Sequence, residues 1–195
     1  MEERKILRDF VVKLKRDKSV WAKIIVLVAL YFGANIYFAY ATDTYWPLTA
    51  GFKAPASDMV MRNGRPVIGL IYALFSMSGL PNRTFYYIST VLALAFLALA
   101  IWIYQKILEK HGVAENTRII VSFACIANIF IIEYFMFIEK CGFMLAVLFN
   151  VIAVYFIEKF FEKKRPQYMI ASVIAVALAI FTYQGSIALL SLIHI

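Results

Sequence analysis

The chain has 195 residues, of which 63% are hydrophobic and 16% charged, and its formal net charge is +8. A soluble domain holds about 45–50% apolar and about 25% charged residues, so this composition argues against a soluble globular protein. The apolar residues also form long runs, several of which reach the roughly 20 residues that a helix needs to cross a bilayer. On such a protein a basic excess reports membrane topology, and we expect no nucleic-acid partner.

The N-terminal segment, residues 1–19, mixes many basic side chains with apolar ones. This pattern predicts either an amphipathic helix on the inner leaflet of the membrane or a partly ordered basic tail. The segment is too charged for a secretory signal peptide, and no small-residue cleavage site follows the first apolar run. We therefore expect a cytoplasmic segment followed by a retained membrane helix.

Apolar runs in the rest of the chain predict about five transmembrane helices. They cover residues 20–41, 85–108, 119–137, 143–160 and 168–183. A further run, residues 66–80, is short for a crossing, which favours a re-entrant or interfacial helix. The expected fold is an all-α polytopic membrane bundle, with one transmembrane domain over residues 20–195.

The distribution of Lys and Arg decides on which side residues 66–80 lie. If they do not cross the membrane, the cytoplasmic side holds 15 of these residues and the external side 5. If they cross, every later loop changes sides and the count becomes 10 against 10. Because basic residues accumulate in cytoplasmic loops, the first arrangement is favoured. It predicts a multi-pass protein of the cell membrane with a cytoplasmic N-terminus and an external segment, residues 42–84.

Two acids of the external segment are candidates for catalysis. Asp43 follows the first predicted span closely, a position that suits a general base acting on a substrate that approaches along the membrane. It could equally be an acid at a helix end that faces water. Asp58 lies in the same external segment. Glu133, inside a predicted span, is either functional or paired with a neighbouring helix.

The sequence Asn63-Gly64-Arg65-Pro66 is the most specific local pattern. Gly64 permits a tight turn, and Pro66 favours a helix start. There the Arg65 guanidinium and the free backbone N–H groups can hold a phosphate, with Arg62 near enough to assist. Alternatively, Arg65 reaches out to lipid phosphates.

Several aromatic and polar residues at the external ends of the helices have two interpretations each. Tyr45, Trp46 and Phe52 could stack on a sugar ring or belong to the aromatic belt of a membrane protein. Tyr183 and Gln184, next to Gly185, could mark a break that lines a cavity or an ordinary helix end.

The order of these parts resembles the polytopic GT-C glycosyltransferases, and most closely the Gtr-type glucosyltransferases that modify bacterial O-antigen and other surface glycans. The resemblance rests on the acid after the first span, on Asn63-Gly64-Arg65-Pro66 with its short helix, and on Phe181-Thr182-Tyr183-Gln184 at a later helix end. It implies a membrane enzyme that transfers a sugar, expected to be glucose, from a polyprenyl-phosphate donor to a surface glycan outside the cell.

The resemblance also assigns roles. Asp43 maps to the essential external acid, with Asp58 as the second candidate. The family often shows adjacent paired acids, whereas Thr44 follows Asp43 here. Many such enzymes use a divalent metal near the acid, and with one acid we do not require it. The substrate-binding residues expected from the motifs and the resemblance are Arg62, Arg65, Glu139, Lys140, Tyr183 and Gln184.

Two further expectations concern the whole protein. Family members are usually more than twice as long, so we expect an N-terminal fragment that is inactive alone. The competing hypothesis is a non-catalytic membrane protein, such as a lipid-linked sugar flippase or a transporter subunit. Transporters place ionisable groups near the membrane midplane, whereas Arg65 and the candidate acids Asp43 and Asp58 lie in the predicted external segment.

Overall fold

The computed structural model describes residues 17–35, 44–128 and 130–188. Within these ranges the chain forms helices joined by turns and contains no strand, so the expected all-α class is confirmed there. Asp43 and residues 1–16 of the basic segment lie outside the described residues.

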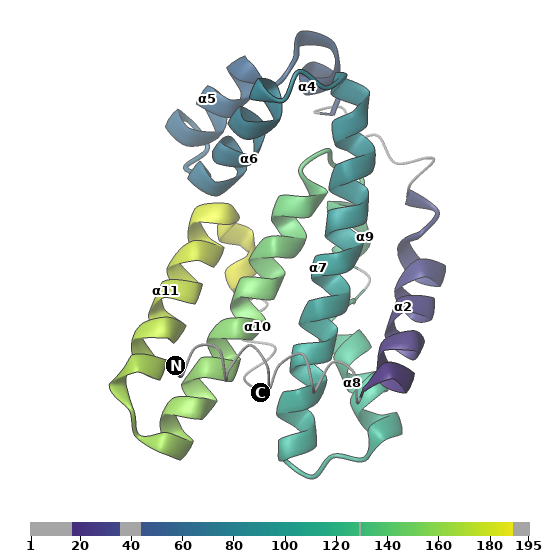
Figure 1. Cartoon of the computed structure of the whole chain (residues 1–195), viewed down its shortest axis with the longest axis vertical. Helices are drawn as coiled ribbons and strands as arrows, with labels where there is room; N and C mark the ends of the chain where they lie inside the picture. Colours follow the sequence, from purple (N-terminus) through teal and green to yellow (C-terminus); the bar gives the residue numbers. More distant parts are fainter. Residues whose placement is uncertain (1–16, 36–43, 129, 189–195) are drawn as a thin grey trace.

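The helices form a bundle with a small cap at one end (Figure 1). Five stretches run along the bundle: α2 (Lys18–Phe32), α7 (Asn82–Lys110), α8 (Glu115–Ile126) with α9 (Phe130–Tyr134), α10 (Lys140–Lys163) and α11 (Pro166–Thr182). The cap consists of α4 (Tyr45–Ala50), α5 (Lys53–Met61) and α6 (Pro66–Met77). A short 3-10 helix, η2 (Gln184–Ser186), follows α11.

Two of the described helices, α7 with 29 residues and α10 with 24, are long and apolar enough to cross a membrane. They pack against each other along the middle of the bundle (Figure 1). Helices α6 and α11 are apolar but shorter. The predicted span 119–137 is divided, because α8 ends at Ile126 and the Asn128 side chain donates to the Cys125 carbonyl, which competes with the helical hydrogen bonds.

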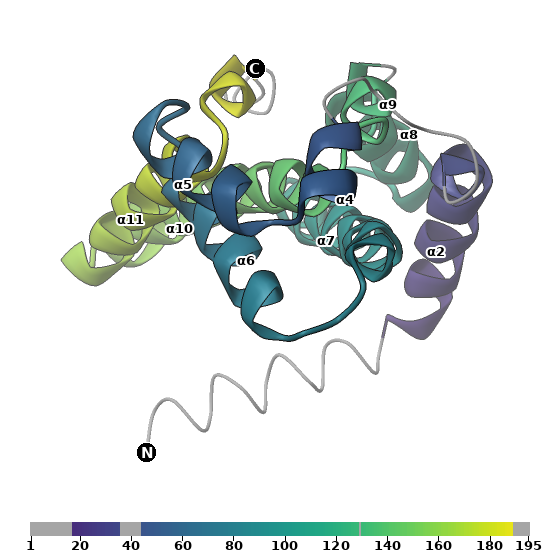
Figure 2. The same cartoon turned by 90° about the horizontal axis from the view of Figure 1, so that it is seen from above.

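The cap lies over the ends of α7 and α10, as the view from above shows (Figure 2). Helix α6 begins at Pro66, as the sequence predicts, and lies beside α5 instead of running along the bundle. The close approach of α5 and α6 needs Gly69, since a Cβ there would lie 2.5 Å from Val60 Cγ2. The ring of Phe52 packs on Phe85 of α7, with 4.6 Å between ring centroids, and fastens the cap to the bundle.

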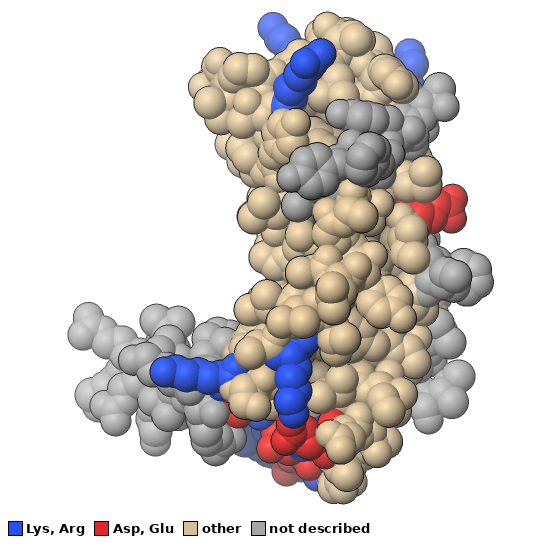
Figure 3. Space-filling view, turned by 90° about the vertical axis from the view of Figure 1, so that its right-hand side faces the viewer, with Lys and Arg blue, Asp and Glu red and all other residues tan. Residues whose placement is uncertain are grey.

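Charged side chains on the face formed by α2 and α8 gather mostly at the two ends, with an uncharged band between them (Figure 3). At the end opposite the cap they pair across helices: Lys106 Nζ lies 2.6 Å from Asp17, and Lys23 Nζ 2.6 Å from Glu115. On the neighbouring helices, Lys110 Nζ lies 2.9 Å from Glu158. Polar ends on either side of an apolar band are what a bilayer requires of a protein surface.

Candidate active site beneath the cap

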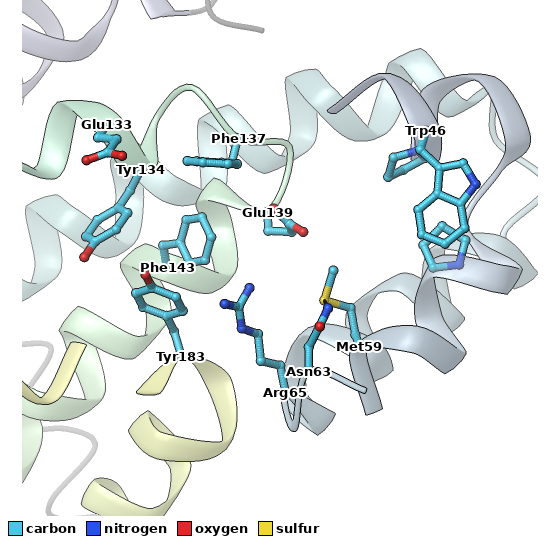
Figure 4. A pocket seen from close by; sticks show the side chains of 12 residues that line it. Trp46, Met59, Asn63, Arg65, Glu133, Tyr134, Phe137, Glu139, Phe143 and Tyr183 are labelled. Atoms are coloured by element: carbon cyan, nitrogen blue, oxygen red, sulfur yellow. Dashed lines mark hydrogen bonds between the residues drawn. The ribbon is translucent and has the colours of Figure 1, made fainter. Parts of the chain in front are cut away.

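A cavity of about 550 Å³ lies between the cap and the bundle (Figure 4). Its walls come from α4, α5, the turn before α6, α9, the α9–α10 turn, the start of α10 and the residue after α11. The lining residues are Trp46, Pro47, Pro55, Met59, Asn63, Arg65, Glu133, Tyr134, Phe137, Glu139, Phe143 and Tyr183. Three of the expected substrate-binding residues, Arg65, Glu139 and Tyr183, therefore meet at one site.

Arg65 enters the cavity from the turn between α5 and α6. Gly64 has a positive φ of 63°, which L side chains rarely adopt, and the Arg65 N–H donates to the Met59 carbonyl at 2.7 Å. The guanidinium carbon lies 4.8 Å from the centroid of the Tyr183 ring. Such a cation–π contact orients a guanidinium without using its N–H donors. The Nε of Arg65 is buried and has no hydrogen-bond partner among the described residues.

Glu139 stands immediately before α10, with its side chain buried and directed at the cavity (Figure 4). Its backbone carbonyl accepts hydrogen bonds from the N–H groups of Gly142 and Phe143, which fixes the start of the helix. Burial raises the pKa of the neighbouring Tyr72 well above its usual range, and the charge of Glu139 raises that pKa further, whereas Arg65 lowers it. Glu139 and Arg65 therefore both lie close enough to Tyr72 for their opposite charges to influence its pKa.

Glu133 also lines the cavity, on α9 beside Tyr134 (Figure 4). The sequence marked it only as an ionisable group inside a predicted span. The structure brings this carboxylate to the cavity on α9, a short helix that is separate from α8. The cavity therefore holds two carboxylates and one guanidinium.

An aromatic group forms the wall next to Arg65. The ring centroids of Phe143 and Tyr183 are 4.6 Å apart, and those of Tyr134 and Tyr183 are 5.4 Å apart. Phe137 packs edge-on against Phe143 at 5.7 Å. These rings, from α9, the α9–α10 turn, α10 and the end of α11, give the cavity a rigid apolar side.

The other expected site residues lie elsewhere. Asp58 of α5 forms an ion pair at 3.5 Å with Arg62, the residue that follows this helix, and neither residue lines the cavity. Lys140 is fully buried, with its Nζ 3.7 Å from the Tyr86 ring centroid, and also does not line it. Gln184 Nε2 donates to the Gly64 carbonyl at 2.9 Å, so it holds the turn that carries Arg65.

Residues that sequence reasoning missed are mostly apolar. Pro47, Pro55 and Met59 line the cavity, yet nothing separates them in the sequence from residues that pack in a core or face lipid. Among the described residues, no three His, Cys, Asp or Glu side chains are grouped as metal ligands. The described residues therefore do not form the metal site of the resembled family, and we derive no metal-dependent step.

Comparison with known proteins adds no assignment to this site. No family model, no curated protein and no solved structure matches the chain. The function is therefore argued from the chemistry of the cavity and from its place in the bundle.

Proposed function

We propose that this chain forms part of a membrane glycosyltransferase that moves a sugar, expected to be glucose, from a polyprenyl-phosphate donor to a surface glycan. In this proposal the bundle lies in the cell membrane as a multi-pass protein, the N-terminus is cytoplasmic, and the cap faces outwards. The observation that carries the proposal is that Arg65 and Glu139 line one cavity at the cap end of an apolar bundle.

The phosphate of the donor would bind at Arg65. A guanidinium offers up to five N–H donors in a planar arrangement that matches phosphate oxygens. The buried Nε of Arg65 has no partner within the described part of the chain, and the Tyr183 ring supports the guanidinium from one side. A lipid-linked sugar has a phosphate next to an apolar chain. A cavity with a guanidinium beside an apolar wall suits such a ligand.

The polyprenyl tail would occupy an apolar groove of about 510 Å³ between α2 and α8. The groove is lined by Leu27, Tyr31, Ile119, Ile120, Phe123, Ala124, Ala127, Asn128 and Ile132. Its last lining residue, Ile132, directly precedes Glu133 of the cavity on α9. In this proposal one amphipathic ligand has its phosphate in the cavity and its tail in the groove.

The reaction needs a base for the acceptor. The base takes the proton of an acceptor hydroxyl, whose oxygen attacks the anomeric carbon of the donor sugar. The bond between that carbon and the phosphate oxygen breaks, and its electron pair leaves with the polyprenyl phosphate, whose charge Arg65 compensates. Asp43 is the base implied by the resemblance, and Glu139 is the buried carboxylate of the described cavity.

The test uses the complete gene and measures transfer of labelled glucose from polyprenyl-phosphate glucose in membranes, together with the surface glycan of the cells. We expect Asp43→Asn or Glu139→Gln to lower the transfer rate by about 10²–10⁴-fold, the usual contribution of a general base. Asp58→Asn is the matched control, because Asp58 pairs with Arg62 away from the cavity, and it should keep activity.

Two results would count against the transferase. Wild-type transfer rates in both the Asp43→Asn and the Glu139→Gln variants would remove the proposed base. Translocation of a lipid-linked sugar across vesicle membranes, without any transfer, would favour the non-catalytic alternative of a flippase or transporter subunit.

A further inference from the structure

The sequence offers three aromatic residues, Tyr45, Trp46 and Phe52, that could stack on a sugar ring. The structure shows which of them a ligand in the cavity can reach. Phe52 is only 2% exposed and packs among Tyr72, Phe75 and Phe85, so a ligand cannot reach its ring. Tyr45 is 59% exposed but does not line the cavity. Trp46 is 45% exposed and lines it.

Trp46 belongs to α4, a short helix that is hydrogen-bonded to other parts of the fold near both of its ends. The Thr44 hydroxyl, just before α4, donates to the Met136 carbonyl at 3.4 Å. Near the end of α4, Asn82 Nδ2 donates to the Leu48 carbonyl at 3.2 Å. Both ends of this short helix are therefore tied to other parts of the fold. A binding group that is already ordered loses little conformational entropy when a ligand arrives.

The cavity has two dissimilar ends, and Trp46 marks one of them. Figure 4 shows Trp46 at one end and the rings of Tyr134, Phe143 and Tyr183 at the other, with Arg65 and Glu139 between them. Ile132, which lines the apolar groove, directly precedes Glu133 at the end of the cavity that holds Tyr134. If the lipid-linked donor occupies that end, the Trp46 end is left for the second substrate.

We propose that Trp46 is the platform on which a neutral pyranose ring of the acceptor stacks, an inference that rests on the proposed function. The C–H face of a pyranose is apolar and covers an indole, while its hydroxyls stay available to a carboxylate such as that of Glu139. This arrangement orients the acceptor hydroxyl towards the centre of the cavity, between the two substrates.

The charges of the cavity favour a neutral ring. Glu133 and Glu139 contribute two negative charges against the single positive charge of Arg65. The phosphate of a bound donor would neutralise Arg65, and an acidic sugar at the Trp46 end would then approach the negative charge of Glu139. Repulsion between like charges would therefore disfavour an acidic sugar relative to a neutral one.

The binding test places the complete gene product in lipid nanodiscs and titrates it with methyl glucoside while following tryptophan fluorescence. We expect a saturable change that is absent in Trp46→Phe, which keeps a ring but removes the reporter. Tyr45→Ala is the matched control, because it alters an exposed ring on the same helix, and it should keep the signal. Methyl glucuronide should bind at least tenfold more weakly.

The kinetic test separates acceptor from donor. Trp46→Ala should raise the acceptor KM at least tenfold and leave the donor KM unchanged, and Trp46→Phe should restore part of the acceptor affinity. A general folding defect would raise both values and would not be rescued by Phe.

The outcomes distinguish the inference from the proposed function. A wild-type acceptor KM in Trp46→Ala overturns the platform and leaves the transferase intact. Failure of all transfer, with Trp46-dependent binding of methyl glucoside retained, overturns the transferase but keeps the sugar platform. A titration without a Trp46-dependent change, or equal binding of methyl glucuronide, contradicts the inference.

Discussion

Gln184, just past the end of α11, donates a hydrogen bond from Nε2 to the carbonyl of Gly64 at 2.9 Å, and a longer one to Asn63 at 3.4 Å. This contact ties the last helix to the turn that carries Arg65. We expect Gln184→Ala to cost about 1 kcal/mol of stability, the usual net value of a hydrogen bond, and to raise the donor KM by loosening Arg65. Thermal unfolding in detergent and steady-state kinetics measure the two effects. An unchanged donor KM would show that Arg65 does not depend on the contact.

Arg65→Lys keeps a positive charge but removes the planar set of N–H donors. If the guanidinium binds the donor phosphate, we expect binding of polyprenyl phosphate to weaken by about 10- to 100-fold, since hydrogen bonds to charged groups contribute about 1.5–3 kcal/mol. Binding of radiolabelled polyprenyl phosphate to the protein in nanodiscs measures this loss. Arg62→Lys is the control, because Arg62 does not line the cavity and pairs with Asp58, and it should bind as the wild type does.

A substitution at Lys140 distinguishes a role in substrate binding from a role in packing. Its ammonium is fully buried over the Tyr86 ring and has no hydrogen-bond partner in the part of the chain that the structure describes, which is costly for a charge. We expect Lys140→Met, of similar volume, to leave the unfolding temperature unchanged or to raise it, and to preserve transfer. A large loss of transfer with normal stability would instead support the substrate-binding role that the sequence suggested.

Gly142 allows α6 of the cap to approach α10. A Cβ at this position would lie 2.7 Å from Ile68 Cγ1, closer than carbon atoms approach in proteins. We expect Gly142→Val to destabilise the protein by about 1–3 kcal/mol, the typical cost of overpacking, and to disturb the cavity. The double variant with Ile68→Ala should recover part of the unfolding temperature. If Gly142→Val alone unfolds like the wild type, the cap does not pack on α10 in this way.

The proposed topology predicts which cysteines a membrane-impermeant reagent labels. In a background with Cys125 and Cys141 replaced by Ala, Gly79→Cys should react in intact cells, because Gly79 is exposed on the cap side. Val113→Cys, in the turn between α7 and α8 at the opposite end, should react only after the cells are opened. Labelling of position 113 in intact cells would reverse the orientation of the bundle.

The sequence by itself determined the helical class and most helix positions, because these follow from local signals. The predicted run 85–108 lies within α7, and the run 143–160 lies within α10. Pro66 starts α6, since a residue without an N–H fits the first turn of a helix, where that donor is unpaired. The break within 119–137 was missed, because apolar periodicity does not reveal a side chain that competes for a helical carbonyl.

Only the tertiary structure decided which residues form the site. Arg65, Glu139 and Tyr183 are far apart in the chain, and the packing of the cap on α10 and α11 brings them to one cavity. The same packing leaves Asp58 and Lys140 outside that cavity and selects Trp46 over Phe52. Apolar and aromatic residues read alike in a sequence whether they face lipid, a core or a ligand, and only the three-dimensional arrangement separates these environments.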